Sequence, residues 1–261
     1  MADAHIFWPL LQREAYALTR HRALQVGWAA ALAGGIAVAA TGDPQSRVWL
    51  LFQIVYYLLP LLALLGTVML VRQDLGEAPL MALLPGASQA RVAAKATVST
   101  AYLLGLLLLL VLPSAFGGNA GDFLLLAVGG ALVVLVCACL GVWRGFCAGT
   151  EVRAYFGALG WWCLLLFGSG ALAFAAHQWL APSATPVATL ATLMSNPLES
   201  FRIFVFFGLN AVPMNPQTSN GLALWWMAHP LVWLAAISLP FASLPLLRAG
   251  WGLRYRAHGA E

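Results

Sequence analysis

Six long stretches of this chain are apolar and contain no Asp, Glu, Lys or Arg. They cover residues 23–40, 48–71, 96–116, 123–142, 154–180 and 222–246, each bound being approximate. About 20 apolar residues form a helix long enough to cross a bilayer. Hydrocarbon offers the backbone no hydrogen-bond partner, so such segments are expected to be helical. Barrel strands would alternate polar with apolar residues, and runs such as Leu103–Leu110 do not. The sequence therefore predicts an all-α membrane protein with six transmembrane helices in one domain.

The basic residues indicate how these helices are oriented. Eleven of the 13 Lys and Arg residues lie at the chain ends or in the second and fourth connections. The other connections carry only Arg47 and Arg202. Basic residues accumulate on the cytoplasmic side of a membrane, so both termini are expected to be cytoplasmic. The net charge of +4 therefore reflects the membrane topology. The sequence contains no basic cluster with interleaved aromatic residues, which a nucleic-acid partner would require.

The segment at residues 6–22, before the first span, has the pattern of an amphipathic helix. From Phe7 to Arg20, apolar residues recur on one side and polar residues on the other, with Glu14 as the one exception on the apolar side. A Trp and several arginines are typical anchors of a helix lying in the membrane interface. The alternative is that this segment is the frayed start of the first span.

Two long connections contain apolar residues of their own. The cytoplasmic connection 72–95 has a short apolar run, Leu80–Leu84, closed by Pro85 and Gly86, which predicts a short helix. Apolar side chains displayed there favour a protein partner. On the outer side, the connection 181–221 contains a turn at Asn196-Pro197 and an apolar run too short to span. Such runs are typical of re-entrant or interfacial helices. Glu199 and Arg202 are spaced to pair as an exposed ion pair of little energetic value.

The residues present exclude several chemistries for this chain. The absence of an ionised side chain from all six spans argues against coupling to an ion gradient through such a residue. Lys95, the only lysine, lies between Ala94 and Ala96, so no phosphate-binding loop can be formed around it. Energy for transport would therefore come from another chain. Gln53, Tyr56 and Tyr57 are the notable polar residues of the second span and either face a cavity or hydrogen-bond to other helices.

Two histidines provide an alternative. His177 lies near the outer end of the fifth span and His229 about two turns into the sixth. Facing histidines can hold haem, and methionines such as Met214 with imidazoles suit copper. The simpler interpretations are interfacial polar side chains and ordinary packing.

The assembled pattern resembles the ABC-2 type permeases of ATP-binding-cassette transporters. The coupling region of that family is similar to Glu77, followed by Leu83-Leu84-Pro85, Arg91 and Lys95, although Ala94 stands where the family usually has Gly. Asn196-Pro197 followed by Arg202 resembles one branch, the NosY-type permeases of nitrous-oxide reductase maturation. The family has an N-terminal interfacial elbow helix, six spans, a coupling helix after the second span and re-entrant outer helices between spans five and six.

The resemblance implies a homodimer in the bacterial inner membrane, carried on two cassette ATPase subunits that bind ATP and Mg²⁺. It implies no catalytic residue and no cofactor on this chain, and a periplasmic accessory partner for delivery of copper or sulfur species. The implied ATPase-coupling residues are Glu77, Leu80, Leu83, Leu84, Pro85 and Glu151. The implied outer gate or partner surface comprises Asn196, Pro197, Glu199 and Arg202. Surrounding lipid is the remaining partner. Competing hypotheses are a haem- or quinone-binding membrane anchor of a redox complex and a non-transporting structural membrane protein.

An absorption spectrum of the purified protein separates the permease from the redox anchor. A permease without cofactor is expected to show no Soret band. A Soret band that disappears in His177→Ala and His229→Ala variants would instead establish haem ligation by facing histidines.

Overall fold

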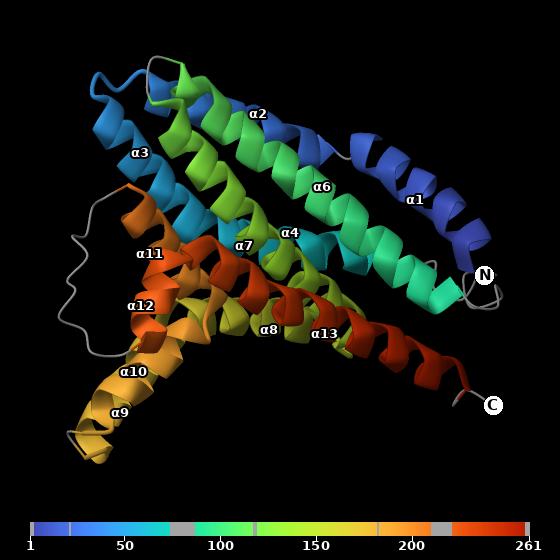
Figure 1. The fold of residues 1–261 in the computed structure, drawn as a ribbon. Helices are drawn as coiled ribbons and strands as arrows, with labels where there is room; N and C mark the ends of the chain where they lie inside the picture. The colour runs from blue at the N-terminus through green and yellow to red at the C-terminus, as the bar shows by residue number, and fades with distance from the viewer. Residues whose placement is uncertain are drawn as a thin grey trace.

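The computed structural model describes residues 3–20, 22–73, 87–116, 119–181, 183–209 and 221–258, and every regular element in these ranges is a helix (Figure 1). The first half consists of α1 (Asp3–Arg20), α2 (Arg22–Ala39), α3 (Pro44–Gln53), the π-helical turn η1 (Ile54–Leu58), α4 (Leu59–Gln73) and α6 (Ala87–Ala115). The second half consists of α7 (Ala120–Cys147), α8 (Glu151–Cys163), the π-helical turn η3 (Leu164–Gly168), α9 (Ser169–Trp179), α10 (Thr185–Met194), α11 (Pro197–Gly208), α12 (Gly221–Ala228) and α13 (Pro230–His258). The predicted all-helical class is confirmed for these residues.

Five of these segments are long and apolar enough to cross a membrane. They are 44–73, 89–115, 120–147, 151–179 and 230–253, and the segments 44–73 and 151–179 continue through the π-helical turns. Counted by the apolar stretches of the sequence, these two are the second and fifth spans. The helices at 6–20 and 24–39 pass the same test together but are bent by 67° where they meet, which brings the total to six if the pair forms one span. The described residues therefore contain five or six candidate spans, which makes the chain a multi-pass membrane protein.

The last predicted span differs in the structure. The apolar stretch at 222–246 is divided between α12 and α13, with His229 at the break instead of two turns inside a span. Pro230 causes the break because proline lacks a backbone N–H and disfavours helical geometry in the residue before it. The candidate span consequently begins at Pro230 and continues to Leu253.

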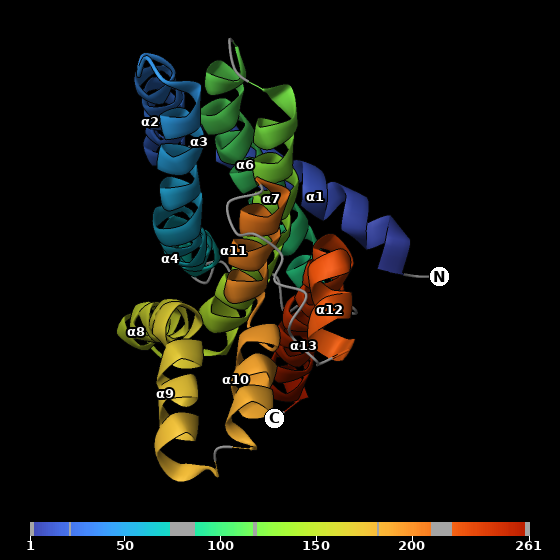
Figure 2. The same ribbon diagram turned by 60° about the vertical axis from the view of Figure 1, so that its left-hand side comes forward.

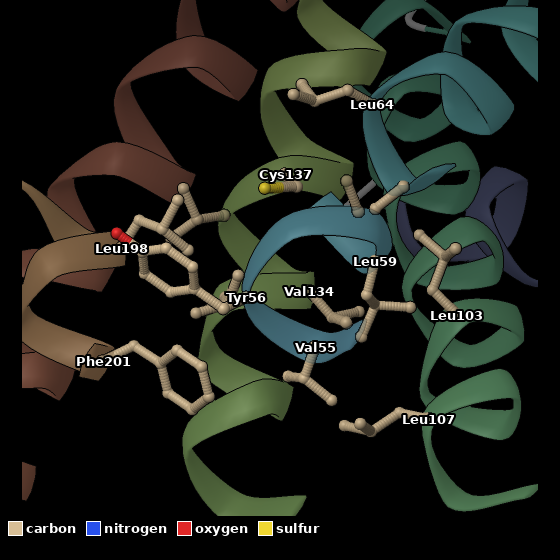
Figure 3. Close-up of a cluster of buried hydrophobic side chains, with 14 of the residues drawn as sticks. Val55, Tyr56, Leu59, Leu64, Leu103, Leu107, Val134, Cys137, Leu198 and Phe201 are labelled. Atoms are coloured by element: carbon tan, nitrogen blue, oxygen red, sulfur yellow. The ribbon is translucent and has the colours of Figure 1, made fainter. Parts of the chain in front are cut away.

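The core lies where α4 and η1 pack between α6 and α7 (Figure 3). Val55, Leu59 and Leu64 are buried there against Leu103 and Leu107 of α6 and against α7. Two small residues one helical turn apart bring α7 close to α4. A Cβ on Gly141 would lie 3.0 Å from the Leu64 carbonyl oxygen, and one on Gly145 would lie 2.6 Å from the Val71 side chain. Small residues spaced by four are a general means of close helix packing in membranes.

Helix α2 is held against α6 by a second close approach. A Cβ on Gly35 would lie 2.6 Å from the Leu110 carbonyl oxygen, so only glycine allows this backbone contact. Two hydroxyl groups of α6 then donate to carbonyls of α2, Tyr102 to Leu24 at 2.9 Å and Ser114 to Gly35 at 3.2 Å.

Helix α1 is attached to α6 by a buried ion pair. Glu14 is the single charged residue on the apolar side of α1, and its Oε2 accepts from Lys95 Nζ. The two side chains are only 5% and 6% exposed, and Leu10 packs beside them on Ala90 and Ala94. The residue that broke the amphipathic pattern of the sequence thus pairs with the only lysine.

Removing one member of this pair should destabilise the protein much more than removing both. We expect Lys95→Met to destabilise the protein by about 3–5 kcal/mol, because Glu14 remains buried without its cation. The double variant Glu14→Leu/Lys95→Met should recover most of the loss. Thermal unfolding in detergent micelles measures both changes. Arg20→Met, which removes an exposed cation from the same helix, should cost less than about 1 kcal/mol. Equal losses from the single and double variants would contradict the interpretation.

Candidate functional site at helix α11

The segment between the fifth and last spans folds back onto the bundle. Helices α9 and α10 lie side by side and project from the other helices, whereas α11 lies beside α7 (Figure 2). The predicted helix start at Asn196-Pro197 is confirmed. Asn196 is the N-cap, its Oδ1 accepts from the Leu198 backbone N–H at 3.0 Å, and Pro197 occupies the first turn. Proline suits this place because the first N–H groups of a helix have no intrahelical acceptor.

The other end of the Asn196 side chain reaches the fifth span. Its Nδ2 donates to the Leu165 carbonyl oxygen at 2.6 Å and lies 3.4 Å from Ser169 Oγ. Leu165 belongs to η3, and a π-helical turn displaces the backbone hydrogen-bond pattern so that a carbonyl becomes available to another donor. One buried amide therefore caps α11 and also bonds to the irregular turn of a neighbouring span.

Glu199 connects α11 to the irregular turn of the second span. Its Oε1 accepts from Tyr56 Oη at 3.0 Å, and its Oε2 lies 2.6 Å from Arg202 Nη2. Tyr56 is part of η1, and Figure 3 shows its ring reaching toward Leu198 and Phe201 of α11. Of the two sequence interpretations of Tyr56, the structure thus shows a hydrogen bond to another helix. The carboxylate also benefits from its place in the first turn, near the positive end of the helix dipole.

The expected exposed ion pair is only half exposed. The side chain of Glu199 is 6% exposed, whereas that of Arg202 is 38% exposed. The prediction of an exposed pair is wrong for Glu199, because its carboxylate lies at the contact between α11 and Tyr56 of η1. An ionisable group among membrane spans is costly and is retained where it has a partner and a role. The burial of this carboxylate has no signal in the sequence, because Glu199 lies outside every apolar stretch.

The second and fifth spans are also bonded to each other next to their irregular turns. Trp162 of α8, two residues before η3, donates through Nε1 to the Tyr57 carbonyl oxygen of η1 at 3.0 Å. The second span, the fifth span and α11 therefore each contact the other two, through Tyr56, Trp162 and Asn196. Each contact uses a side chain, so the set can be broken or remade without unwinding any helix.

Aromatic packing reinforces the contact between the second span and α11. Phe52 stacks on Tyr56 with ring centroids 5.4 Å apart and lies 5.9 Å from the ring of Phe201. On α7, a Cβ on Gly129 would lie 2.7 Å from the ring of Phe201, so glycine at this position makes room for α11. The polar group therefore sits beside a closely packed apolar layer.

At the opposite end of the bundle, two connections are bonded together. Arg72, at the end of α4, donates through Nη2 to the carbonyl oxygens of Ala148 and Thr150, the second at 2.9 Å. Ala148 and Thr150 lie in the short connection between α7 and α8, where Thr150 caps α8 and Glu151 is exposed in its first turn. The other predicted coupling residues, Glu77, Leu80, Leu83, Leu84 and Pro85, lie outside the described residues.

The candidate metal or haem residues are separate from the α11 site. His177 is exposed in the last turn of α9. His229 is exposed at the break before α13, where its ring stacks on Trp225 with centroids 5.5 Å apart. Met214 lies outside the described residues. Within the described ranges, no three His, Cys, Asp or Glu side chains are grouped so as to hold a metal ion. The haem hypothesis, which needs only two histidines, stays a prediction.

Comparison with known proteins gives no family assignment: no family model matches the chain, and no curated protein matches it.

Loss of the Tyr56 hydroxyl should destabilise the protein much more than loss of the Tyr57 hydroxyl. Tyr56→Phe leaves a buried Glu199 oxygen without its donor, so we expect a destabilisation of about 1–3 kcal/mol in thermal unfolding. Tyr57→Phe is the matched control, because Tyr57 is 47% exposed and its side chain makes only a ring contact with other described residues. Equal shifts in the two variants would show that the hydrogen bond to Glu199 is not important.

A companion variant separates the two roles of Asn196. Asn196→Asp keeps an oxygen to cap α11 but places a carboxylate against the Leu165 carbonyl oxygen. The α11 contact with the fifth span should therefore weaken while the helix start is preserved.

Proposed function

We propose that this chain is the membrane-spanning subunit of an ATP-binding-cassette transporter of the ABC-2 type, powered by a separate ATPase. The observation that carries the proposal is the attachment of α11 to two interrupted spans through Asn196 and Glu199. A re-entrant outer helix held by side-chain contacts alone suits a gate that opens and closes. The sequence adds the coupling-like segment from Glu77 to Lys95 and the absence of a phosphate-binding loop.

The proposed topology follows the distribution of basic residues. Both termini are cytoplasmic, α1 is the interfacial elbow helix at about 6–22, and α2 is the first span. The bend of 67° between the two helices suits an elbow entering a span. On this placement the Glu14–Lys95 pair attaches the elbow to the start of α6, directly after the connection proposed to meet the ATPase.

The proposed mechanism transmits ATPase closure to the outer gate. The ATPase subunits bind ATP and Mg²⁺, and closing them would move the short helix containing Leu80, Leu83 and Leu84. Arg72 joins the base of that connection to the α7–α8 connection, so both would move together. The spans would then shift between two arrangements, as packed helices do in other switching proteins. The rigid packing of α4 on α7 at Gly141 and Gly145 would carry the shift toward η1 and α11.

The proposed assembly is a homodimer on two ATPase subunits in the bacterial inner membrane. Within their most apolar windows, the spans at 151–179 and 230–253 are only 22% and 17% buried, so both have large apolar faces for a second copy or for lipid. The Asn196-Pro197 segment supports the narrower proposal of a NosY-type permease. Such a permease would work with a periplasmic accessory protein in supplying copper or sulfur species for nitrous-oxide reductase maturation.

Association with the ATPase is the decisive test. Co-expressed cassette ATPase from the same gene neighbourhood should co-purify with the wild-type chain. Leu83→Asp/Leu84→Asp should reduce that association by at least about tenfold, because two charges would enter an apolar docking groove.

The matched control places the same two charges on the other face of the expected helix. In Met81→Asp/Ala82→Asp, the two charges are again on adjacent residues of the expected helix, and their mean direction is roughly opposite that of Leu80, Leu83 and Leu84. That variant should retain the ATPase. If Leu83→Asp/Leu84→Asp retained it equally well while reaching the membrane in equal amount, the docking assignment would be wrong.

A further inference from the structure

A cleft of about 260 Å³ lies between α7, α8 and α13. Its lining includes Leu140 and Trp143 of α7 and Trp161 of α8, and α13 contributes Pro240, Phe241, Leu244, Pro245 and Arg248. The cleft is distinct from the α11 site and from the connections proposed to meet the ATPase. Every lining residue except Arg248 is apolar or aromatic.

Along α13, the residues that line the cleft change from apolar to cationic. Pro240, Phe241, Leu244, Pro245 and Arg248 recur at helical spacing and so share one face of the helix. Pro240 and Arg248 are eight residues apart, or about 12 Å along the axis. Arg248 lies near the end of the candidate span, which finishes at Leu253, whereas Pro240 lies well inside it. The cleft is therefore apolar toward the membrane interior and cationic toward its surface.

Two polar groups of the lining lack partners within the described part of the chain. Arg248 is exposed and makes no ion pair or hydrogen bond with a described residue. The indole N–H of Trp143 is buried and also has no described acceptor. Trp143 and Trp161 are in edge contact, with ring centroids 6.0 Å apart, and Arg144 lies 5.5 Å from the ring of Trp143. A ligand that brings phosphate oxygens to this end of the cleft would supply an acceptor to the exposed Arg248 guanidinium.

We propose that this cleft binds an anionic phospholipid. One acyl chain lies over Phe241, Leu244 and Trp161, and the phosphate faces Arg248. Charge complementarity selects an anionic headgroup, because cationic side chains near an acidic membrane surface attract such lipids. The proposal depends on the membrane placement of the spans and not on the transport function, so either can fail alone.

Native mass spectrometry of the full-length protein in detergent micelles tests the proposal. The protein is titrated with phosphatidylglycerol or with phosphatidylcholine of the same acyl chains. Wild type should bind phosphatidylglycerol more tightly than phosphatidylcholine. Arg248→Gln should weaken phosphatidylglycerol binding by about fivefold and phosphatidylcholine binding by much less, because the choline cation already offsets the phosphate charge.

Arg22→Gln is the matched control, because it removes the same charge from an exposed position away from the cleft. It should leave the affinity for phosphatidylglycerol unchanged. Equal binding of both lipids by the wild type, or equal losses in the two variants, would overturn the proposal.

A variant that fills the cleft tests the acyl-chain position. Leu244 is 63% exposed, so Leu244→Trp should fold while reducing the binding of both lipids. Unchanged binding of both lipids would overturn the assignment. Occupation by a second copy of the chain is the competing outcome. It would appear as copy-to-copy cross-linking of Leu244→Cys in oxidised membranes, beyond the level of the wild type, and would also overturn the proposal.

Discussion

The absence of water from the interior of a membrane helix bundle makes each buried polar group depend on a partner within the protein. In this chain that constraint acts on a few groups with large consequences. Tyr56 of η1 donates to Glu199 and Asn196 donates to the Leu165 carbonyl oxygen of η3, and these two contacts help to fix where α11 lies. The Glu14–Lys95 pair has the same role for α1. Buried polar contacts thus add to the apolar packing that attaches these two helices to the bundle.

The spans themselves are assembled by a different interaction. Hydrocarbon tails are as apolar as the helix surfaces, so close packing takes the place of the hydrophobic effect between helices. Gly35 allows α2 to approach the backbone of α6, and Gly141 and Gly145 bring α7 onto α4. These contacts make a closely packed centre, and the fifth and last spans pack against it with much of their surface uncovered. Such a division gives a stiff body with apolar faces for lipid or another chain, which suits a subunit of a larger assembly.

Sequence patterns were a good guide to the existence of the helices and a weaker one to their interruptions. Apolar length was sufficient for the helical class because no other structure satisfies the backbone in hydrocarbon. The start of α11 was predictable from Asn196-Pro197, since the side-chain cap and the proline act locally. Pro230 is a sequence signal for the break before α13. The apolar residues on both sides of it nevertheless favoured one longer span. Neither η1 nor η3 had a local signal, because a π-helical turn depends on the donors that neighbouring helices bring to its carbonyls.

The candidate site shows the same limit. Glu199 and Arg202 were expected to pair from their spacing, and they do. The burial of Glu199 depends on Tyr56, which is 143 residues away in sequence. Glu14 was conspicuous as a charge on an apolar face, yet spacing along the chain could not assign Lys95 as its partner.

The sequence by itself determined that this is a helical membrane protein, because long uncharged apolar stretches have one stable form in a bilayer. It also contained the asymmetry of basic residues on which the proposed orientation rests. Only the tertiary structure decided which polar groups are buried together, which spans are interrupted, and where an apolar cleft ends at an arginine. These features depend on side chains brought together from distant segments, and helix periodicity carries no information about such long-range contacts.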